Sequence, residues 1–319
     1  MNSSSKKYIA AVAALQILMY HCWIPVFGVG TAIGSLERFL VASTYSGVDI
    51  FFFISAYSLS ARPVEIGDYG GFIRNRALKV LPFFIIALIL GKFIWFLPAI
   101  MITYLVFPLI YRICRKRPVL AIPLLAAGWA VLVWLLLGVL KPAQDIGIFL
   151  FRIPAIIIGA YAAGMWTKVG DLIGESQAGF VKICFGIMLL ATGMMMVYQY
   201  GYVNKLNEPY RGTFYLFGIP TMLGTVLIVD SLAKYIKRIG PLDRVITAFG
   251  SMTLELYFTQ MVLGTVLINA VFGVIRNKLL TNLVVMAIII LISWLLQKLE
   301  GIAHKTMDLF RMWQYNRLK

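Results

Sequence analysis

The sequence contains repeated apolar runs of about the length that crosses a lipid bilayer. We place ten of them at roughly 8–26, 46–61, 80–96, 97–111, 119–140, 146–166, 178–200, 214–232, 246–272 and 280–297. The chain of 319 residues is 61% hydrophobic and only 13% charged, whereas soluble globular proteins have about a quarter charged residues. A transmembrane β-barrel would instead show short alternating segments. The sequence therefore predicts an all-α polytopic membrane protein with about ten transmembrane helices.

Two of these runs need comment. The first starts at Tyr8, is longer than the apolar region of a signal peptide and lacks a clear cleavage site, so we expect it to be the first span. The third and fourth are separated only by Leu97–Ala99, which predicts a tight helical hairpin at that point. The cysteines have no paired spacing, so neither a metal site nor a disulfide framework is expected; they are Cys22, Cys114 and Cys184.

The distribution of positive charge predicts the orientation. Most of the 29 Lys and Arg fall in alternate loops, on the side that also holds the N-terminus. Because cytoplasmic loops are enriched in Lys and Arg, this bias predicts an even number of spans with both termini in the cytoplasm. It also explains most of the net charge of +16 without nucleic-acid binding.

We expect residues 1–299 to form the membrane core and residues 300–319 a basic amphipathic cytoplasmic tail. The tail alternates apolar and basic residues, which is typical of a helix lying on an anionic membrane surface. The longest outer loops are expected at Ala32–Tyr45 and Gly201–Thr213. No internal repeat is evident.

Ionisable residues within spans are costly and often mark function. His21 falls near the outer end of the first span and Asp49 near the outer end of the second, so they are expected at the same depth. A carboxylate bonded to one imidazole nitrogen would leave the other nitrogen free to act as a base. A histidine bonded to backbone or water at the interface is the simpler alternative.

Two further charges lie in or beside spans. Glu255 is expected inside the ninth span, with Ser251 on the same helix face. A structural carboxylate at a helix contact would explain it equally well. Arg152 begins the sixth span and could simply extend its guanidinium to the interface.

A basic segment stands at the inner mouth of the third span. Arg76 and Lys79 lie three residues apart, with Arg74 just before them and Pro82 just inside the span. Such a cluster could bind the phosphates of a cytosolic ligand. The general enrichment of positive charge on the inner side would also place arginines here.

Together these segments resemble the acyltransferase 3 family of integral membrane acyltransferases. Its members have a core of roughly ten spans, a histidine ending the first span, a "GVDLFFVLSGF"-like segment, a basic "RRxxRxxP" segment and a late "GSxSLxLYLxH"-like span. The matching stretches are "LMYH" (Leu18–His21), "GVDIFFFISAY" (Gly47–Tyr57), "RALKVLP" (Arg76–Pro82), "FRIPAIIIGAYAAG" (Phe151–Gly164) and "GSMTLELYFTQ" (Gly250–Gln260). Their order and spacing carry the resemblance.

The sequence departs from the family pattern in several places. The family often has Arg or Lys eleven residues before the histidine, where this chain has Ala10. Another residue, such as Lys7, would have to replace it. The second basic residue of the pair is Lys79, "SGF" has become Ser55–Tyr57, and Gln260 stands where the family has a late histidine.

The resemblance implies transfer of an acyl group, in the first instance acetyl, from cytosolic acyl-CoA to a hydroxyl of a cell-envelope glycan or lipid-linked sugar. The site would be in the cell (plasma or inner) membrane, with acyl-CoA as donor substrate, no permanently bound cofactor and no metal. His21 would be the general base and Asp49 its orienting carboxylate. The other residues implied are Arg74, Arg76 and Lys79 for the CoA phosphates, with Ser55, Arg152, Glu255, Tyr257 and Gln260 as substrate or oxyanion candidates.

Donor and base are expected at opposite faces of the membrane. Either the pantetheine arm of CoA threads between spans, or the acyl group moves through a covalent intermediate. A threaded path would need small residues, and those available are Gly47, Ser55, Ala56 and Gly164.

Two other classes of function remain open. Asp49, Glu255 and Arg152 could bind a small zwitterionic solute, such as an amino acid, in a membrane transporter. A noncatalytic membrane subunit that recruits a partner through its tail is the second. The sequence does not indicate the oligomeric state.

Overall fold

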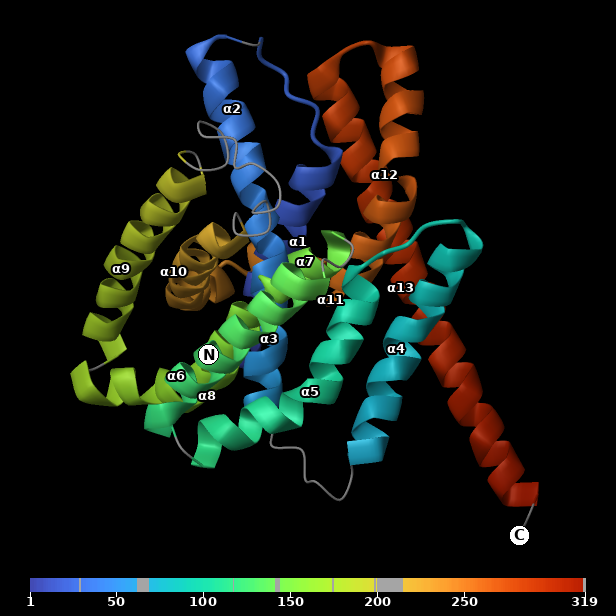
Figure 1. The fold of residues 1–319 in the computed structure, drawn as a ribbon. Coiled ribbons are helices and arrows are strands. Elements are labelled where there is room, and N and C mark those ends of the chain that lie inside the picture. The colour runs from blue at the N-terminus through green and yellow to red at the C-terminus, as the bar shows by residue number, and fades with distance from the viewer. Residues whose placement is uncertain are drawn as a thin grey trace.

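A computed structural model describes residues 1–28, 30–61, 69–116, 118–140, 144–173, 175–197, 199 and 215–317. These residues form helices and connecting turns, with no strand among them. The expected outer loop at Gly201–Thr213 lies outside the described residues. The helices are α1 (Ser3–Cys22), α2 (Ala32–Ser43), α3 (Gly47–Ser60), α4 (Tyr69–Ile89), α5 (Phe96–Lys116), α6 (Pro118–Val133), α7 (Gln144–Leu150), α8 (Ile153–Ile173), α9 (Glu175–Met196), α10 (Gly218–Arg238), α11 (Gly240–Ser251), α12 (Thr253–Ile275) and α13 (Lys278–Arg317) (Figure 1).

Eight helices of the described chain are long and apolar enough to cross a membrane. They correspond to all the expected spans except the first and third, which are α1 and α4. The helix α4 carries three basic residues in its first half. The helix α1 packs against α3, α10, α11 and α12, and several of its residues, including Tyr8, Ile9 and Leu18, are completely buried. A helix surrounded by protein can be more polar than one that faces lipid.

The segment expected as the outer loop Ala32–Tyr45 is helical, so that prediction was wrong. The helix α2 begins at Thr31, whose hydroxyl caps it by accepting a hydrogen bond from the backbone N–H of Gly34 at 3.0 Å. It continues through one 3₁₀ turn at Thr44–Ser46 into α3, giving a helical run of 29 residues over Ala32–Ser60. The irregular segment therefore lies earlier, just after α1.

Two other boundaries differ from expectation. The turn between α4 and α5 lies over residues 90–95, and Leu97–Ala99 instead forms the first turn of α5. Pro98 is well tolerated in this first turn, because the N–H that proline lacks would have no partner there. The expected ninth span is broken at Met252 into α11 and α12, which puts Glu255 in the first turn of α12. The helix α13 continues past Leu299 to Arg317.

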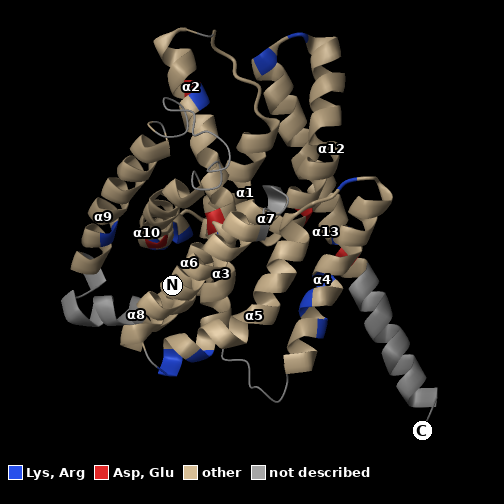
Figure 2. Ribbon diagram, viewed as in Figure 1, with Lys and Arg blue, Asp and Glu red and all other residues tan. Residues whose placement is uncertain are grey.

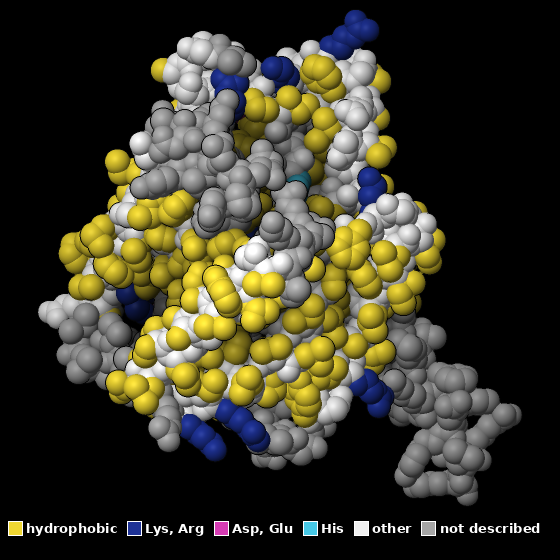
Figure 3. Space-filling model, in the orientation of Figure 1, with side chains coloured by type: hydrophobic (Ala, Val, Ile, Leu, Met, Phe, Trp, Pro, Cys, Tyr) yellow, Lys and Arg dark blue, Asp and Glu magenta, His cyan; other side chains and the backbone are white. Residues whose placement is uncertain are grey.

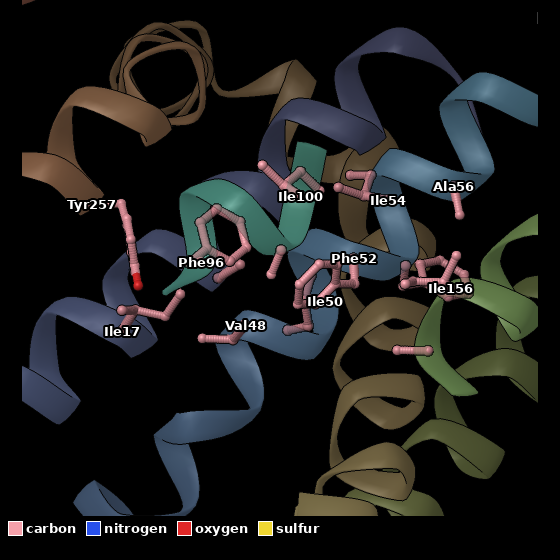
Figure 4. Packing of buried hydrophobic residues seen from close by; sticks show 14 of the residues in the cluster. Ile17, Val48, Ile50, Phe52, Ile54, Ala56, Phe96, Ile100, Ile156 and Tyr257 are labelled. Carbon is pink, nitrogen blue, oxygen red and sulfur yellow. The ribbon is translucent and has the colours of Figure 1, made fainter. Parts of the chain in front are cut away.

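The core lies around α3, because other helices pack against it on several sides. Phe52 and Phe53 are completely buried, and Figure 4 shows Ile50, Phe52 and Ile54 among side chains of α5, α8 and α12. Gly159 of α8 lies so close to α3 that an added Cβ would be 2.3 Å from the carbonyl oxygen of Phe53. These contacts fix α3 against α8.

The outer surface is apolar over wide areas. Large side chains such as Ile89, Val119 and Val274 are more than three quarters exposed, and hydrophobic atoms cover most of the face in Figure 3. Lys and Arg gather mainly near the ends of the helices (Figure 2). An apolar belt between charged ends is the surface that a bilayer requires.

Candidate active site

A cavity of about 310 Å³ lies at the N-terminal end of α1. It is lined by residues of α1, α3, α4, α5 and α11, and three of them are basic: Lys6, Lys7 and Arg76. We call this space the basic cavity. Its volume is at the lower end of the range for small-molecule sites, roughly 300–1,000 Å³.

Aromatic side chains hold the guanidinium of Arg76 in place. Its Cζ lies 5.5 Å from the ring centroid of Phe72 and 5.6 Å from that of Tyr104. The hydroxyl of Tyr104 is in turn hydrogen-bonded to Ser55, and both residues line the cavity. Arg76 is therefore presented in a defined position, with hydroxyl groups beside it. The pattern of the sequence did not indicate Tyr104, because it lies in an apolar run.

The position at which the family often has Arg or Lys, occupied here by Ala10, also lies at this cavity. Ala10 lines it, one helical turn from Lys7 and Lys6, which line it too. The backbone here is tightly packed, since a Cβ on Gly250 of α11 would lie 2.1 Å from the carbonyl oxygen of Lys7. Two lysines thus stand next to the position that is basic in the family.

Arg74 and Lys79 occupy different surroundings. Both are exposed, and neither is among the described residues that line the basic cavity. Lys79 interacts electrostatically with Glu255, which is itself hydrogen-bonded to Glu300 of α13. The structure thus brings Arg76 to the cavity, while Lys79 lies outside the cavity lining, within electrostatic range of Glu255.

Asp49 is paired with Arg152 rather than with His21. Arg152 is 2% exposed and Asp49 is 0% exposed, and a guanidinium nitrogen donates to the Oδ2 of Asp49. Tyr215 and Tyr45 flank the guanidinium, with ring centroids 4.5 and 5.3 Å from its Cζ. Within the described part of the chain, no ion pair joins His21 to Asp49. Arg152 therefore does not extend to the interface, because it neutralises a buried carboxylate.

His21 lies in the last turn of α1, at the opposite end from the basic cavity. Its side chain is exposed, and its ring meets the ring of Tyr20 edge-on at 5.1 Å. Gly47 of α3 packs beside Ala13 and Ile17 of α1. Asp49 is two residues further along α3, which runs antiparallel to α1, so it lies nearer the middle of α1 than His21 does. The two residues do not share a depth.

Three of the oxyanion candidates, Ser55, Tyr257 and Gln260, lie in different surroundings. Ser55 lines the basic cavity. Tyr257 lies in the apolar core, with its ring centroid 4.8 Å from that of Phe96. Figure 4 labels both side chains in the cluster. Gln260 is buried on the next turn of α12, with its Oε1 unpaired. Only Ser55 of these three contacts the cavity.

The path expected between donor and base is closely packed at two of its four small residues. A Cβ on Gly47 would lie 2.6 Å from the carbonyl oxygen of Ala13, and Ala56 is 0% exposed. The side chains of Ile17, Val48 and Phe96 lie together in this region (Figure 4). Lys7 and His21 are 14 residues apart on one helix, which corresponds to about 21 Å.

One comparison with known proteins identifies a family. Residues 8–94 and 92–298 match the family model described as an acyltransferase domain, that of the acyltransferase 3 family. No curated protein and no solved structure matched the chain. The match covers His21 and the Asp49–Arg152 pair, and it includes Arg76 of the basic cavity but begins after Ser3, Lys6 and Lys7. The chain therefore belongs to the acyltransferase 3 family and is a membrane acyltransferase.

Proposed function

We propose that the enzyme takes its acyl group from acyl-CoA bound at the basic cavity and transfers it to a hydroxyl of a cell-envelope glycan or lipid-linked sugar. The basic cavity carries this proposal. Lys6, Lys7 and Arg76 reach it from two helices that are far apart in sequence. Arginine and lysine are the side chains that most often bind phosphate, and CoA has several phosphate groups.

The orientation predicted from the distribution of Lys and Arg supports the same donor. With both termini in the cytoplasm of a cell whose plasma or inner membrane holds the protein, the N-terminal end of α1 faces the cytosol. The cavity then opens from the side where acyl-CoA is made. We take acetyl-CoA as the simplest donor, with its phosphates at the basic cavity of about 310 Å³ and the rest of the molecule extending beyond it.

The reaction needs a base, and His21 is suited to that role. In the proposed step, His21 takes the proton of the acceptor hydroxyl, and the oxygen of that hydroxyl attacks the thioester carbonyl. The thioester C–S bond then breaks, and the CoA sulfur leaves with the proton from His21. General-base help of this kind is typically worth about 10²–10⁴-fold. Exposure of His21 at the far end of α1 gives an acceptor access to it.

Asp49 has a supporting role in this proposal. Its charge is neutralised by Arg152, and the pair joins α3 to the start of α8. The same pairing disfavours a transporter site for a zwitterionic solute, because each group already has the other as partner.

The acyl group must travel the length of α1 between the cavity and His21. Separation of α1 from α3 would allow the pantetheine arm to pass. A covalent acyl-enzyme intermediate would carry the group without such a movement. Rapid quenching of the enzyme with radiolabelled acetyl-CoA distinguishes the two routes, since only the second leaves label on the protein.

The direct test uses purified protein in detergent with acetyl-CoA. We expect calorimetry to show binding that is weakened by Arg76→Ala, and thiol release that is abolished by His21→Ala with binding intact. Absence of acetyl-CoA binding to the wild-type protein would refute the proposed donor. Full turnover by His21→Ala would refute the proposed base.

A further inference from the structure

The chain that follows His21 is held by a carboxylate of the next helix. Three donors converge on Glu37 of α2. The indole Nε1 of Trp23 and the backbone N–H of Val26 both donate to its Oε1 at 2.8 Å, and the N–H of Phe27 donates to its Oε2 at 2.9 Å. Hydrogen bonds to an ionised carboxylate are about twice as strong as neutral ones.

A second residue holds the same segment from the other side. Asn282 of α13 is 0% exposed and bonds both backbone groups of Ile24. Its Oδ1 accepts from the N–H of Ile24 at 2.9 Å, and its Nδ2 donates to the carbonyl of Ile24 at 2.8 Å. A buried amide that pairs with both backbone groups of one residue leaves that residue little freedom.

The residue beside His21 is fixed as well. Cys22 is buried, and a Cβ on Gly264 of α12 would lie 2.9 Å from its Sγ. The N–H of Trp23 closes the last turn of α1 by donating to the carbonyl of Met19 at 3.1 Å. His21 is thus the exposed position at a helix end that three other helices hold. Its backbone lies between these held residues, and its side chain is exposed.

We infer that Glu37 and Asn282 are positioning residues that hold His21 where the acceptor hydroxyl meets it. The inference rests on the proposed role of His21 as base. A base must lie within about 2.6–3.2 Å of the proton it removes, and a displacement of about 1 Å can cost 10²-fold in rate. Neither residue contacts the reacting atoms. They act through the backbone of residues 23–27.

The test compares Glu37→Gln and Asn282→Leu with the matched control Asn277→Ala. Asn277 accepts a hydrogen bond from the N–H of Leu280 at 3.0 Å, at the start of the same helix α13, and it is exposed. Thiol release from acetyl-CoA gives kcat and KM, and hydrogen–deuterium exchange follows the amides of residues 23–27. Asn282→Asp serves where Asn282→Leu does not fold, since it has the same shape but loses the donor.

We expect faster exchange at residues 23–27 and a fall in kcat of about tenfold or more, with KM for acetyl-CoA within about twofold. The control should change neither quantity. Added to His21→Ala, Glu37→Gln should cause no further loss, because residues that act as a unit are not additive. Unchanged kcat in spite of faster exchange would overturn the inference, as would lost kcat without faster exchange. Full activity of His21→Ala alone would instead overturn the proposed base, and the positioning role with it.

Discussion

Arg152 and Asp49 are 103 residues apart in sequence and form an ion pair that is closed to solvent on every side. The pair joins α3 to the start of α8 in the centre of the bundle. One atom of each partner, the Oδ1 of Asp49 and the Nε of Arg152, makes no hydrogen bond. The charges therefore depend on each other for compensation, and the aromatic rings of Tyr45 and Tyr215 complete the surroundings of the guanidinium.

Removal of Arg152 should destabilise the protein strongly. Breaking a buried pair leaves an uncompensated charge, which costs about 3–5 kcal/mol. We expect Arg152→Leu to lower the thermal unfolding temperature in detergent far more than Arg115→Ala, which changes an exposed arginine beside Tyr111. The double variant Asp49→Leu/Arg152→Leu should be more stable than Arg152→Leu alone, because no charge is then left buried. Equal losses of unfolding temperature in Arg152→Leu and Arg115→Ala would contradict this account of the pair.

Arg76 should contribute directly to the affinity for acyl-CoA. A hydrogen bond to a charged group is worth about 1.5–3 kcal/mol, so Arg76→Ala should weaken acetyl-CoA binding roughly 10- to 150-fold. Arg74→Ala is the matched control, since Arg74 is exposed on the same helix and lies outside the cavity lining. Calorimetric titration of both variants gives the comparison. A similar loss in both would mean that only the overall charge of the segment matters.

The sequence was enough to place most of the helices, because each is a long apolar run. It failed where a local polar signal was decisive. The segment Ala32–Tyr45 contains Glu37 and Arg38 and was expected to be a loop, yet Thr31 caps a helix there and Glu37 is satisfied by three donors. Capping and the partners of a polar side chain decide such a segment, and a hydropathy pattern does not contain them.

The candidate site was predicted in part. The segment containing Arg76 was identified as a possible phosphate site, and Lys7 was named as a replacement for the basic residue missing at Ala10. Both residues line the basic cavity. The partner of Asp49 was not predicted, since similar expected depth suggested His21 and nothing local indicates Arg152. Tyr104 and Asn282 were missed because their contacts join elements far apart in the sequence. Glu37 was missed because its donors, in the irregular segment just after α1, were expected to be part of a span and its flank.

The lysines of α1 should bind acetyl-CoA in place of the Arg or Lys that the family often has at the position of Ala10. We expect Lys7→Ala to weaken acetyl-CoA binding, and Ala10→Lys in the same chain to restore it, because both positions line the cavity one turn apart. Lys116→Ala changes an exposed lysine of α5 outside the cavity lining and should leave the affinity within about twofold. Failure of Ala10→Lys to improve binding in the Lys7→Ala protein would show that Lys7 contributes in another way.

The contact between α1 and α11 should make stability depend on acidic pH. The buried Tyr8 hydroxyl donates a hydrogen bond to the Oδ1 of Asp243, and Thr247 donates to the same oxygen at 3.1 Å. These bonds, the one from Tyr8 foremost, hold the pKa of Asp243 below its ordinary value. A carboxyl group whose folded pKa is depressed stabilises the fold above its unfolded pKa, about 3.9, and this contribution is lost as the pH falls through the folded value. Tyr8→Phe should therefore unfold at a lower temperature than wild type at pH 7, and the difference should shrink between pH 5 and pH 3. Tyr235→Phe, a change at an exposed tyrosine of α10, should show no such convergence in the same detergent. A constant gap between wild type and Tyr8→Phe across this range would mean that Asp243 does not derive its stabilising charge state from Tyr8.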